Sequence, residues 1–238
     1  MAFVPNQSHL VAMLFLLTGG VLGLLGVVWV YALAAGKGKL ARRVLFLAAS
    51  CTGLYLGVLL GVSWASDERT LGPGEQKYFC ELDCHLAYSV GDVLMAKTLG
   101  SGERQATAQG TFYVVKLKTH FDEKTISSRR PKEALLWPNL RWEAVVDEQG
   151  RRYTTSLAGL KALEAPAGEN VPLTQSLRPG ESYETILVFD LPADARNPRL
   201  LLTDPFPVNL VLIGHENSFL HKKVFFRLEP HSAALAAN

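Results

Sequence analysis

Two long stretches of uncharged, mostly apolar residues near the N-terminus constrain this chain more than any other feature. The first extends from Leu10 to Ala35 and the second from Val44 to Ser66. Each exceeds the about 20 residues that a helix needs to cross the hydrocarbon core of a bilayer. The first is also too long for a cleaved signal peptide, and no basic segment precedes it. We therefore expect residues 1–69 to form a hairpin of two transmembrane helices.

The charges around these stretches predict the orientation of the hairpin. Its connection, residues 36–43, carries Lys37, Lys39, Arg42 and Arg43, whereas residues 1–9 contain no Lys, Arg, Asp or Glu. Short loops rich in Lys and Arg stay on the cytoplasmic side of a membrane. We therefore expect both chain termini to lie on the extracytoplasmic side.

Small residues recur at intervals of four along the second apolar stretch. At helical spacing they form one smooth stripe, and a shorter one occurs in the first stretch. Such stripes allow two helix backbones to approach closely within a membrane. Two interpretations remain open: the stripes pack on each other within the chain, or the longer one receives a helix of a partner protein. The predicted helix-packing residues are Gly19, Gly23, Ala49, Gly53, Gly57, Gly61 and Ala65.

Beyond the hairpin the pattern changes to short β-strands. A linker containing Gly72-Pro73-Gly74 is expected over residues 70–75, then a β domain over 76–230 and a flexible tail over 231–238. A helical turn or two is expected only near residues 157–164. Many short strands separated by Gly/Pro turns favour a sandwich or barrel. The expected strands are about 87–97, 111–119, 142–146, 151–155, 185–189, 200–203, 208–213 and 223–228.

Residues 177–192, which read LRPGESYETILVFDLP, and residues 198–203, which read PRLLLT, carry a family resemblance. A Pro-Gly turn precedes a strand that ends in Phe-x-x-Pro. This pattern resembles a bacterial family of secreted and membrane-anchored immunoglobulin-like domains of unknown function, akin to the mycobacterial immunoprotective secreted antigen. The resemblance covers roughly residues 105–228. It implies an all-β immunoglobulin-like sandwich, a bacterial source and no catalytic residue. Together with the orientation predicted from the charges, we expect the domain on the outer side of the bacterial inner membrane.

Cys80-Glu-Leu-Asp-Cys84-His85 is the most unusual short segment of the outer domain. Outside the cytoplasm, Cys80 and Cys84 could form a local disulfide if the segment turns, because the Cα atoms must come within about 7 Å. Alternatively, both thiolates and His85 could bind copper or zinc. A third interpretation is an expanded relative of the Cys-x-x-Cys-His haem attachment motif. The sequence leaves these alternatives open.

A second candidate is the polar segment 214–223, between two apolar stretches. His215 and His221 could supply further metal ligands, because loops on sandwiches often carry binding residues. The competing interpretation is a solvated turn in which Asn217 and Ser218 satisfy backbone groups.

The remaining composition argues against several classes of function. The chain has 24 basic and 22 acidic residues, a balance without the clustered positive face of a nucleic-acid-binding protein. It contains no Gly-x-Ser-x-Gly elbow and no phosphate-binding glycine loop. We therefore expect a non-catalytic accessory subunit without a cofactor, bound to the bilayer and to an integral membrane partner or a second copy. The alternative is a copper-binding or thiol redox module of the cell envelope.

Overall fold

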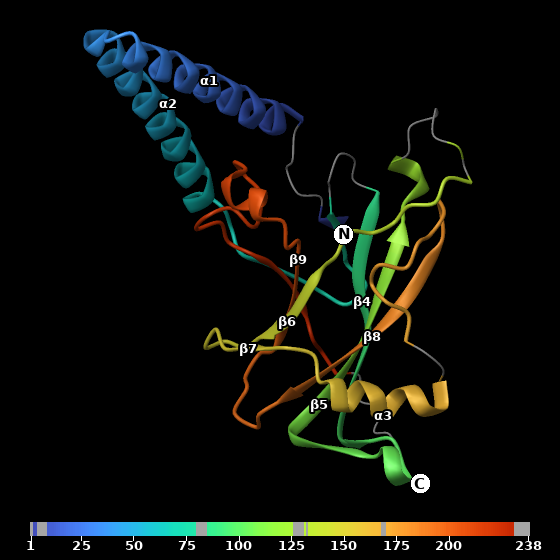
Figure 1. The fold of residues 1–238 in the computed structure, drawn as a ribbon. Coiled ribbons are helices and arrows are strands. Elements are labelled where there is room, and N and C mark those ends of the chain that lie inside the picture. The colour runs from blue at the N-terminus through green and yellow to red at the C-terminus, as the bar shows by residue number, and fades with distance from the viewer. Residues whose placement is uncertain are drawn as a thin grey trace. The chain divides into compact units, whose positions relative to one another are not determined.

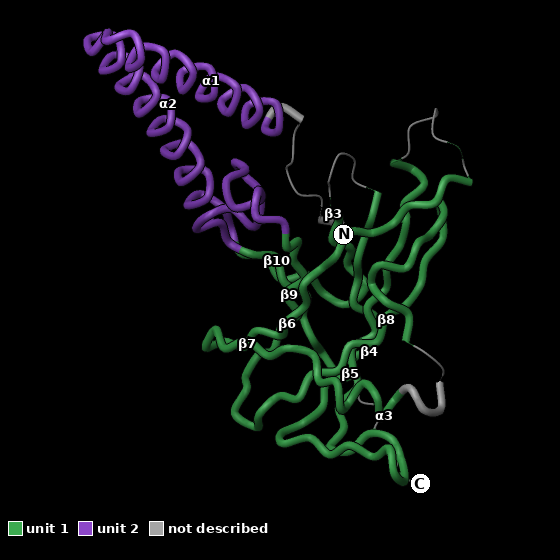
Figure 2. Tube along the Cα trace, in the orientation of Figure 1, with its two compact units in different colours: residues 1–5, 68–205, 223–238 green, residues 6–67, 206–222 purple. Residues whose placement is uncertain are grey.

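The computed structural model describes residues 2–3, 9–79, 85–125, 131, 133–167 and 170–230. The chain divides into two compact units. One contains the two N-terminal helices together with residues 206–222, and the other contains the strands. Figure 2 colours the helical unit purple and the β unit green.

The helical unit begins with two long apolar helices, α1 (His9–Ala34) and α2 (Gly38–Trp64), which form a hairpin (Figure 1). Both are long and apolar enough to cross a membrane. Helix α2 starts earlier than the predicted Val44, so most of the basic residues belong to its first turns. The reason is a tight reversal at Gly36, which adopts φ +68° while Lys37 N–H donates to Ala32 O at 2.8 Å and closes α1.

Contacts within the hairpin concentrate near this reversal. Ala32 of α1 and Ala41 and Val44 of α2 are buried there. Most other apolar side chains of both helices are exposed, and no residue of the most apolar window of α1 is buried. The helices therefore do not form the core of a soluble protein, in which such side chains would be covered.

The β unit is a two-layer sandwich built from two five-stranded sheets in the described residues. One sheet has the order β1 (Ala2–Phe3), β3 (Gln76–Phe79), β4 (Leu86–Leu99), β5 (Ala106–Phe121), β8 (Ser182–Leu191). The other has the order β2 (Arg69–Leu71), β10 (Val224–Arg227), β9 (Arg199–Thr203), β6 (Trp142–Val146), β7 (Arg152–Tyr153). The pairs β1–β3 and β2–β10 are parallel, and the others are antiparallel.

The main core lies between the two sheets. Alternate residues of each strand point inward, as the period of two requires. The first sheet contributes Val115 and Phe189, and the second contributes Leu200 and Phe226, all fully buried. Long strands β4 and β5 pair over most of their length, with irregularities between Val90 and Val93 and between Ala96 and Thr98.

A helix covers part of the outer face of the first sheet, where the sequence predicted only a turn or two. Helix α3 spans Leu157–Ala167, and its Ala162 is buried in a second cluster with Phe112 and Val188. Gly159 allows this close packing, because a Cβ atom there would lie 2.6 Å from Val188 Cγ1. The helix forms because the sheet supplies an apolar surface for it to pack on. The short sequence of the helix does not reveal this surface.

The expected linker and one expected strand also differ from the structure. Residues 69–71, the last residue of the expected hairpin and the first two of the expected linker, form β2, which pairs with β10. Gly72-Pro73-Gly74 is a turn in which Gly74 N–H donates to Val90 O. The strand expected at 208–213 is instead the 3-10 helix η3 (Pro207–Val211) followed by turns. Pro207 has no N–H for a β-ladder, and this segment belongs to the helical unit.

Candidate functional site

The small-residue face of α2 is open. A Cβ atom built at Gly53, Gly57 or Gly61 would meet no atom within 4 Å outside the backbone of its own helix. Gly19 and Gly23 of α1 have equally open surroundings. The two glycine stripes therefore do not pack on each other in the hairpin. The exposed members of the stripe on α2 are Ala49, Gly53, Gly57, Gly61 and Ala65.

A different face of α2 is occupied by residues 206–222, which we call the helix-side loop. Tyr55 Oη donates to Val211 O at 2.6 Å, and the hydroxyls of Ser63 and Ser218 share a hydrogen bond of 3.2 Å. Tyr55 and Ser63 lie about 80° apart around the helix, and each lies about 200° from a glycine of the stripe, Gly57 and Gly61 respectively. The loop therefore leaves the glycine stripe uncovered.

The helix-side loop contains both histidines that the sequence offered as extra metal ligands. His215 is buried, and its Nδ1 accepts a hydrogen bond from Asn217 N–H at 2.9 Å. His221 Nδ1 lies 2.7 Å from Lys222 O and donates to it. In the part of the chain that the structure describes, no three His, Cys, Asp or Glu side chains gather as metal ligands. Each histidine ring therefore bonds a backbone group of a nearby residue.

The segment Cys80–Cys84 lies outside the described residues, but His85 is described. It is buried at the start of β4, and its ring stacks on Phe121 with centroids 5.5 Å apart. His85 Nδ1 lies 2.5 Å from Thr125 Oγ1, and the Thr125 hydroxyl donates to Asp122 O. The hydrogen bond between His85 Nδ1 and Thr125 Oγ1 fixes the orientation of the imidazole ring.

A tyrosine–aspartate pair lies beside His85. Tyr78 Oη donates to Asp122 Oδ2 at 2.7 Å, while Asp122 N–H donates to His85 O. Burial and this hydrogen bond raise the pKa of Tyr78 to about 12. The same hydrogen bond holds the pKa of Asp122 below its usual value. The pair therefore stays in one protonation state near neutral pH and joins the end of β3 to the residue that follows β5.

Sequence reasoning missed two buried cations in the sandwich. Lys77 Nζ donates to Leu202 O at 2.8 Å and lies 4.8 Å from the ring centroid of Phe79. The guanidinium of Arg141 lies 4.4 Å from the same centroid and 3.4 Å from Asp204 Oδ2. Both interactions stabilise positive charge away from water. The alternation that places Lys77 on the same face as inward-pointing Phe79 is the signal that could have revealed this.

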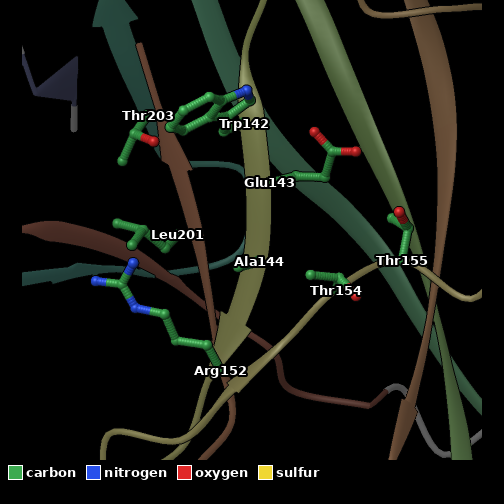
Figure 3. Close-up of a pocket in the computed structure, with 8 residues that line it drawn as sticks. All are labelled: Trp142, Glu143, Ala144, Arg152, Thr154, Thr155, Leu201 and Thr203. Atoms are coloured by element: carbon green, nitrogen blue, oxygen red, sulfur yellow. The ribbon is translucent and has the colours of Figure 1, made fainter. Parts of the chain in front are cut away.

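A pocket lies on the second sheet, formed by β6, β9 and the chain after β7 (Figure 3). Its volume is about 370 Å³. Burial raises the pKa of Glu143, which belongs to β6 and lines the pocket. Glu143 is the one carboxyl group among the described residues that line the pocket. The lining residues are Trp142, Glu143, Ala144, Arg152, Thr154, Thr155, Leu201 and Thr203.

Comparison with known proteins finds similarity in structure only. No protein-family model matches the sequence, and no curated protein matches it. The secreted protein MPT63 from Mycobacterium tuberculosis is 10% identical, with a TM-score of 0.40 over 68% of this chain and 97% of that one. The yjhA protein from Bacillus subtilis is 12% identical, with a TM-score of 0.41 over 67% and 100%. A conserved hypothetical protein from Bacillus anthracis is 17% identical, with a TM-score of 0.37 over 54% and 92%.

Proposed function

We propose that this protein is a membrane-anchored, non-catalytic interaction subunit of a larger membrane complex. In this proposal, α1 and α2 cross the bacterial inner membrane and present an immunoglobulin-like domain of the MPT63 type on the extracytoplasmic side. The observation that carries the proposal is the open stripe of Gly53, Gly57 and Gly61 on a long apolar helix. A smooth, uncovered face of this kind permits a second helix backbone to pack at short range.

The distribution of charge supports the proposed orientation. Lys37, Lys39, Arg42 and Arg43 cluster at the turn of the hairpin, and the apolar remainder of both helices carries no Lys, Arg, Asp or Glu. Helices without ionisable groups at depth do not suit proton relay or ion conduction. Their role in the proposal is anchoring and packing, with the basic turn on the cytoplasmic side.

The stripe predicts a partner helix from another integral membrane protein or from a second copy of this chain. The test is to purify the intact protein from its native membranes in mild detergent and to quantify stoichiometric companions by mass spectrometry, with chemical crosslinking to detect self-association. Gly57→Leu adds bulk to the stripe and should remove the companion or the self-association. The matched control Thr52→Leu adds the same side chain about 140° around the helix from Gly57 and should retain it.

A wild-type protein that is isolated alone and monomeric would contradict the proposal. So would a companion that the Gly57→Leu variant binds as strongly as the wild type does. A companion lost equally in both variants would indicate a general disturbance of α2 and would also count against the stripe.

The alternative function is a metal or thiol redox module, favoured by one observation at His85. Its Nδ1 shares a hydrogen bond with the Thr125 hydroxyl, and this second partner orients the ring. Cys84 precedes it directly in sequence, and thiolate with imidazole is a donor set suited to copper or zinc. Metal analysis of the purified wild type beside Cys84→Ser tests this function. Metal in the wild type that the variant loses supports it, and equal, near-zero contents reject it.

A further inference from the structure

The helix-side loop, residues 206–222, buries polar side chains and exposes apolar ones, the reverse of what is usual for a loop in water. Its polar side chains are inside: Glu216 is 7% exposed and Ser218 is 2% exposed. Its large apolar side chains are outside: Phe219 is 53% exposed and Leu220 is 76% exposed. A loop surrounded by water would bury the phenylalanine and leucine and expose the glutamate. This arrangement suits an apolar surrounding medium. Further buried polar residues are Asn209 and His215, and further exposed apolar residues are Phe206, Val208 and Leu210.

The backbone of the loop satisfies many of its polar groups internally. Phe219 N–H donates to Leu210 O at 3.1 Å and joins the two sides of the loop. Further backbone bonds are Asn209 to Phe206, His215 to Leu212, Ser218 to His215 and His221 to Ser218. A non-helical segment in lipid needs such internal partners, because hydrocarbon offers none.

Hydrogen bonds hold the loop beside the last turns of α2. They join Val211 to Tyr55, Ser218 to Ser63 and Lys222 N–H to Ser66 Oγ. Counting about 20 residues for the hydrocarbon core from Val44, which follows the last basic residue, reaches Ser63. Tyr55 and Ser63 therefore both fall within the apolar span, and the loop beside them lies within the outer half of the bilayer.

The backbone at the tip of the loop is strained. Leu220 adopts φ +61°, a left-handed conformation that glycine or asparagine adopts more readily. The strained residue presents the most exposed side chain of the apolar group. Two positions later comes the exposed Lys222, whose charge suits the anionic headgroups that border the hydrocarbon.

We propose that the helix-side loop is a lipid-binding element, in which Phe219 and Leu220 contact the acyl chains of the outer leaflet while Lys222 contacts phosphate headgroups. The proposal rests on the membrane anchoring by α1 and α2 stated above. It adds a second, non-helical attachment of the β unit to the membrane, formed by the chain between β9 and β10.

Site-specific photocrosslinking in the intact protein tests the proposal. p-Benzoylphenylalanine replaces Phe219 in one variant, Phe46 of α2 in a second and Trp142 of the sandwich in a third, since all three are exposed aromatic side chains. Each variant is reconstituted into vesicles of phosphatidylethanolamine and phosphatidylglycerol and illuminated, and phospholipid adducts are identified by mass spectrometry. Adducts are expected at positions 219 and 46, and at least tenfold fewer at position 142. The same probe at Leu220 provides a second measurement if the first variant folds poorly.

Adducts at position 46 without adducts at positions 219 and 220 would overturn the lipid-binding loop and leave the anchoring intact. An absence of adducts at position 46 would overturn the anchoring and the loop together. If illumination in native membranes links position 219 to a protein and to no lipid, the loop is a protein interface and the proposal is wrong.

Discussion

The hydroxyl of Tyr55 donates to the backbone carbonyl of Val211 across 2.6 Å, although 156 positions separate the two residues in sequence. The bond joins an apolar helix to a loop inserted between two strands of the sandwich. It also satisfies a polar group on each side. This contact gives a direct way to measure how firmly the helix-side loop is held.

Replacing Tyr55 by phenylalanine should loosen the loop without changing the shape of the helix. Loss of one hydrogen bond costs about 1 kcal/mol, or about a fivefold change in the opening equilibrium. Cleavage of the intact, detergent-solubilised protein after Lys222 by trypsin should therefore be about fivefold faster. Tyr31→Phe is the matched control, because the Tyr31 hydroxyl meets only the exposed Lys37 among the hydrogen bonds described for it. Equal cleavage rates for all three proteins would refute a holding role for Tyr55.

Lys77 should stabilise the packing of the two sheets. Its Nζ reaches from β3 of one sheet to the carbonyl oxygens of Leu202 and Val224 in the other, at 2.8 and 3.4 Å. Lys77→Met keeps the aliphatic part of the side chain but removes these bonds, so we expect the free energy of unfolding to fall by about 1–3 kcal/mol. Urea unfolding of the intact protein in detergent measures this change. Lys97→Met is the control, because exposed Lys97 also donates to two carbonyl groups but stays within one sheet. Similar decreases in the free energy of unfolding for the two variants would show that the bonds between the sheets contribute no more than bonds within one sheet.

Gly110 should tolerate no side chain. A Cβ atom there would lie 1.9 Å from Leu191 O and 2.7 Å from Pro192 Cα, and these backbone atoms can move only if β5 separates from β8. Gly110→Ala should reduce the free energy of unfolding by about 1–3 kcal/mol or more. Gly91→Ala places its methyl group 3.6 Å from Lys116 O, an ordinary contact, and should cost much less. Thermal unfolding followed by circular dichroism compares the two variants. Equal midpoints would mean that β8 is not held as closely to Gly110 as the structure indicates.

The turn between β6 and β7 should make the sandwich sensitive to acid. Burial alone would raise the pKa of Asp147, but hydrogen bonds from Arg151 and Tyr153 outweigh it, and the pKa lies below its usual value. Asp147 Oδ2 accepts from Arg151 Nε at 2.7 Å and from Tyr153 Oη at 3.0 Å. A carboxyl with a depressed folded-state pKa contributes stability above its unfolded pKa of about 4 and loses it as the pH falls through the folded pKa.

Wild-type stability should therefore decline below about pH 4, and Asp147→Asn should show a smaller decline from a lower starting value. Denaturant titrations at several pH values between neutral and strongly acidic conditions provide the measurement. Asp92→Asn, which removes an exposed ion pair with Lys116, should keep the wild-type dependence on pH. An Asp147→Asn curve parallel to that of the wild type would contradict the assignment.

Much of the architecture was predictable from local patterns. The two helices follow from the length of two uncharged stretches, and strands such as β5 and β8 follow from alternation and turn residues. The prediction failed at 208–213, where an apolar stretch resembles a strand but Pro207 and a neighbouring helix impose turns. It also underestimated the length of α3, because the apolar surface that stabilises this helix belongs to strands distant in sequence.

The candidate sites were also only partly predictable from the sequence. The glycine spacing on α2 is visible in the sequence, but only the fold shows that α1 leaves it open. His85 is conspicuous beside two cysteines, whereas its hydrogen bond to Thr125 depends on how β4 meets the chain after β5. Lys77 gave no sequence signal beyond its position two residues before Phe79.

The amino-acid sequence by itself determined the apolar helices, the basic turn between them and the β character of the remaining chain, because length, charge and periodicity are local properties. Only the tertiary structure decided that residues 206–222 lie along α2 with polar side chains inside and Phe219 and Leu220 outside. The physical reason is that burial depends on which distant segments approach each other.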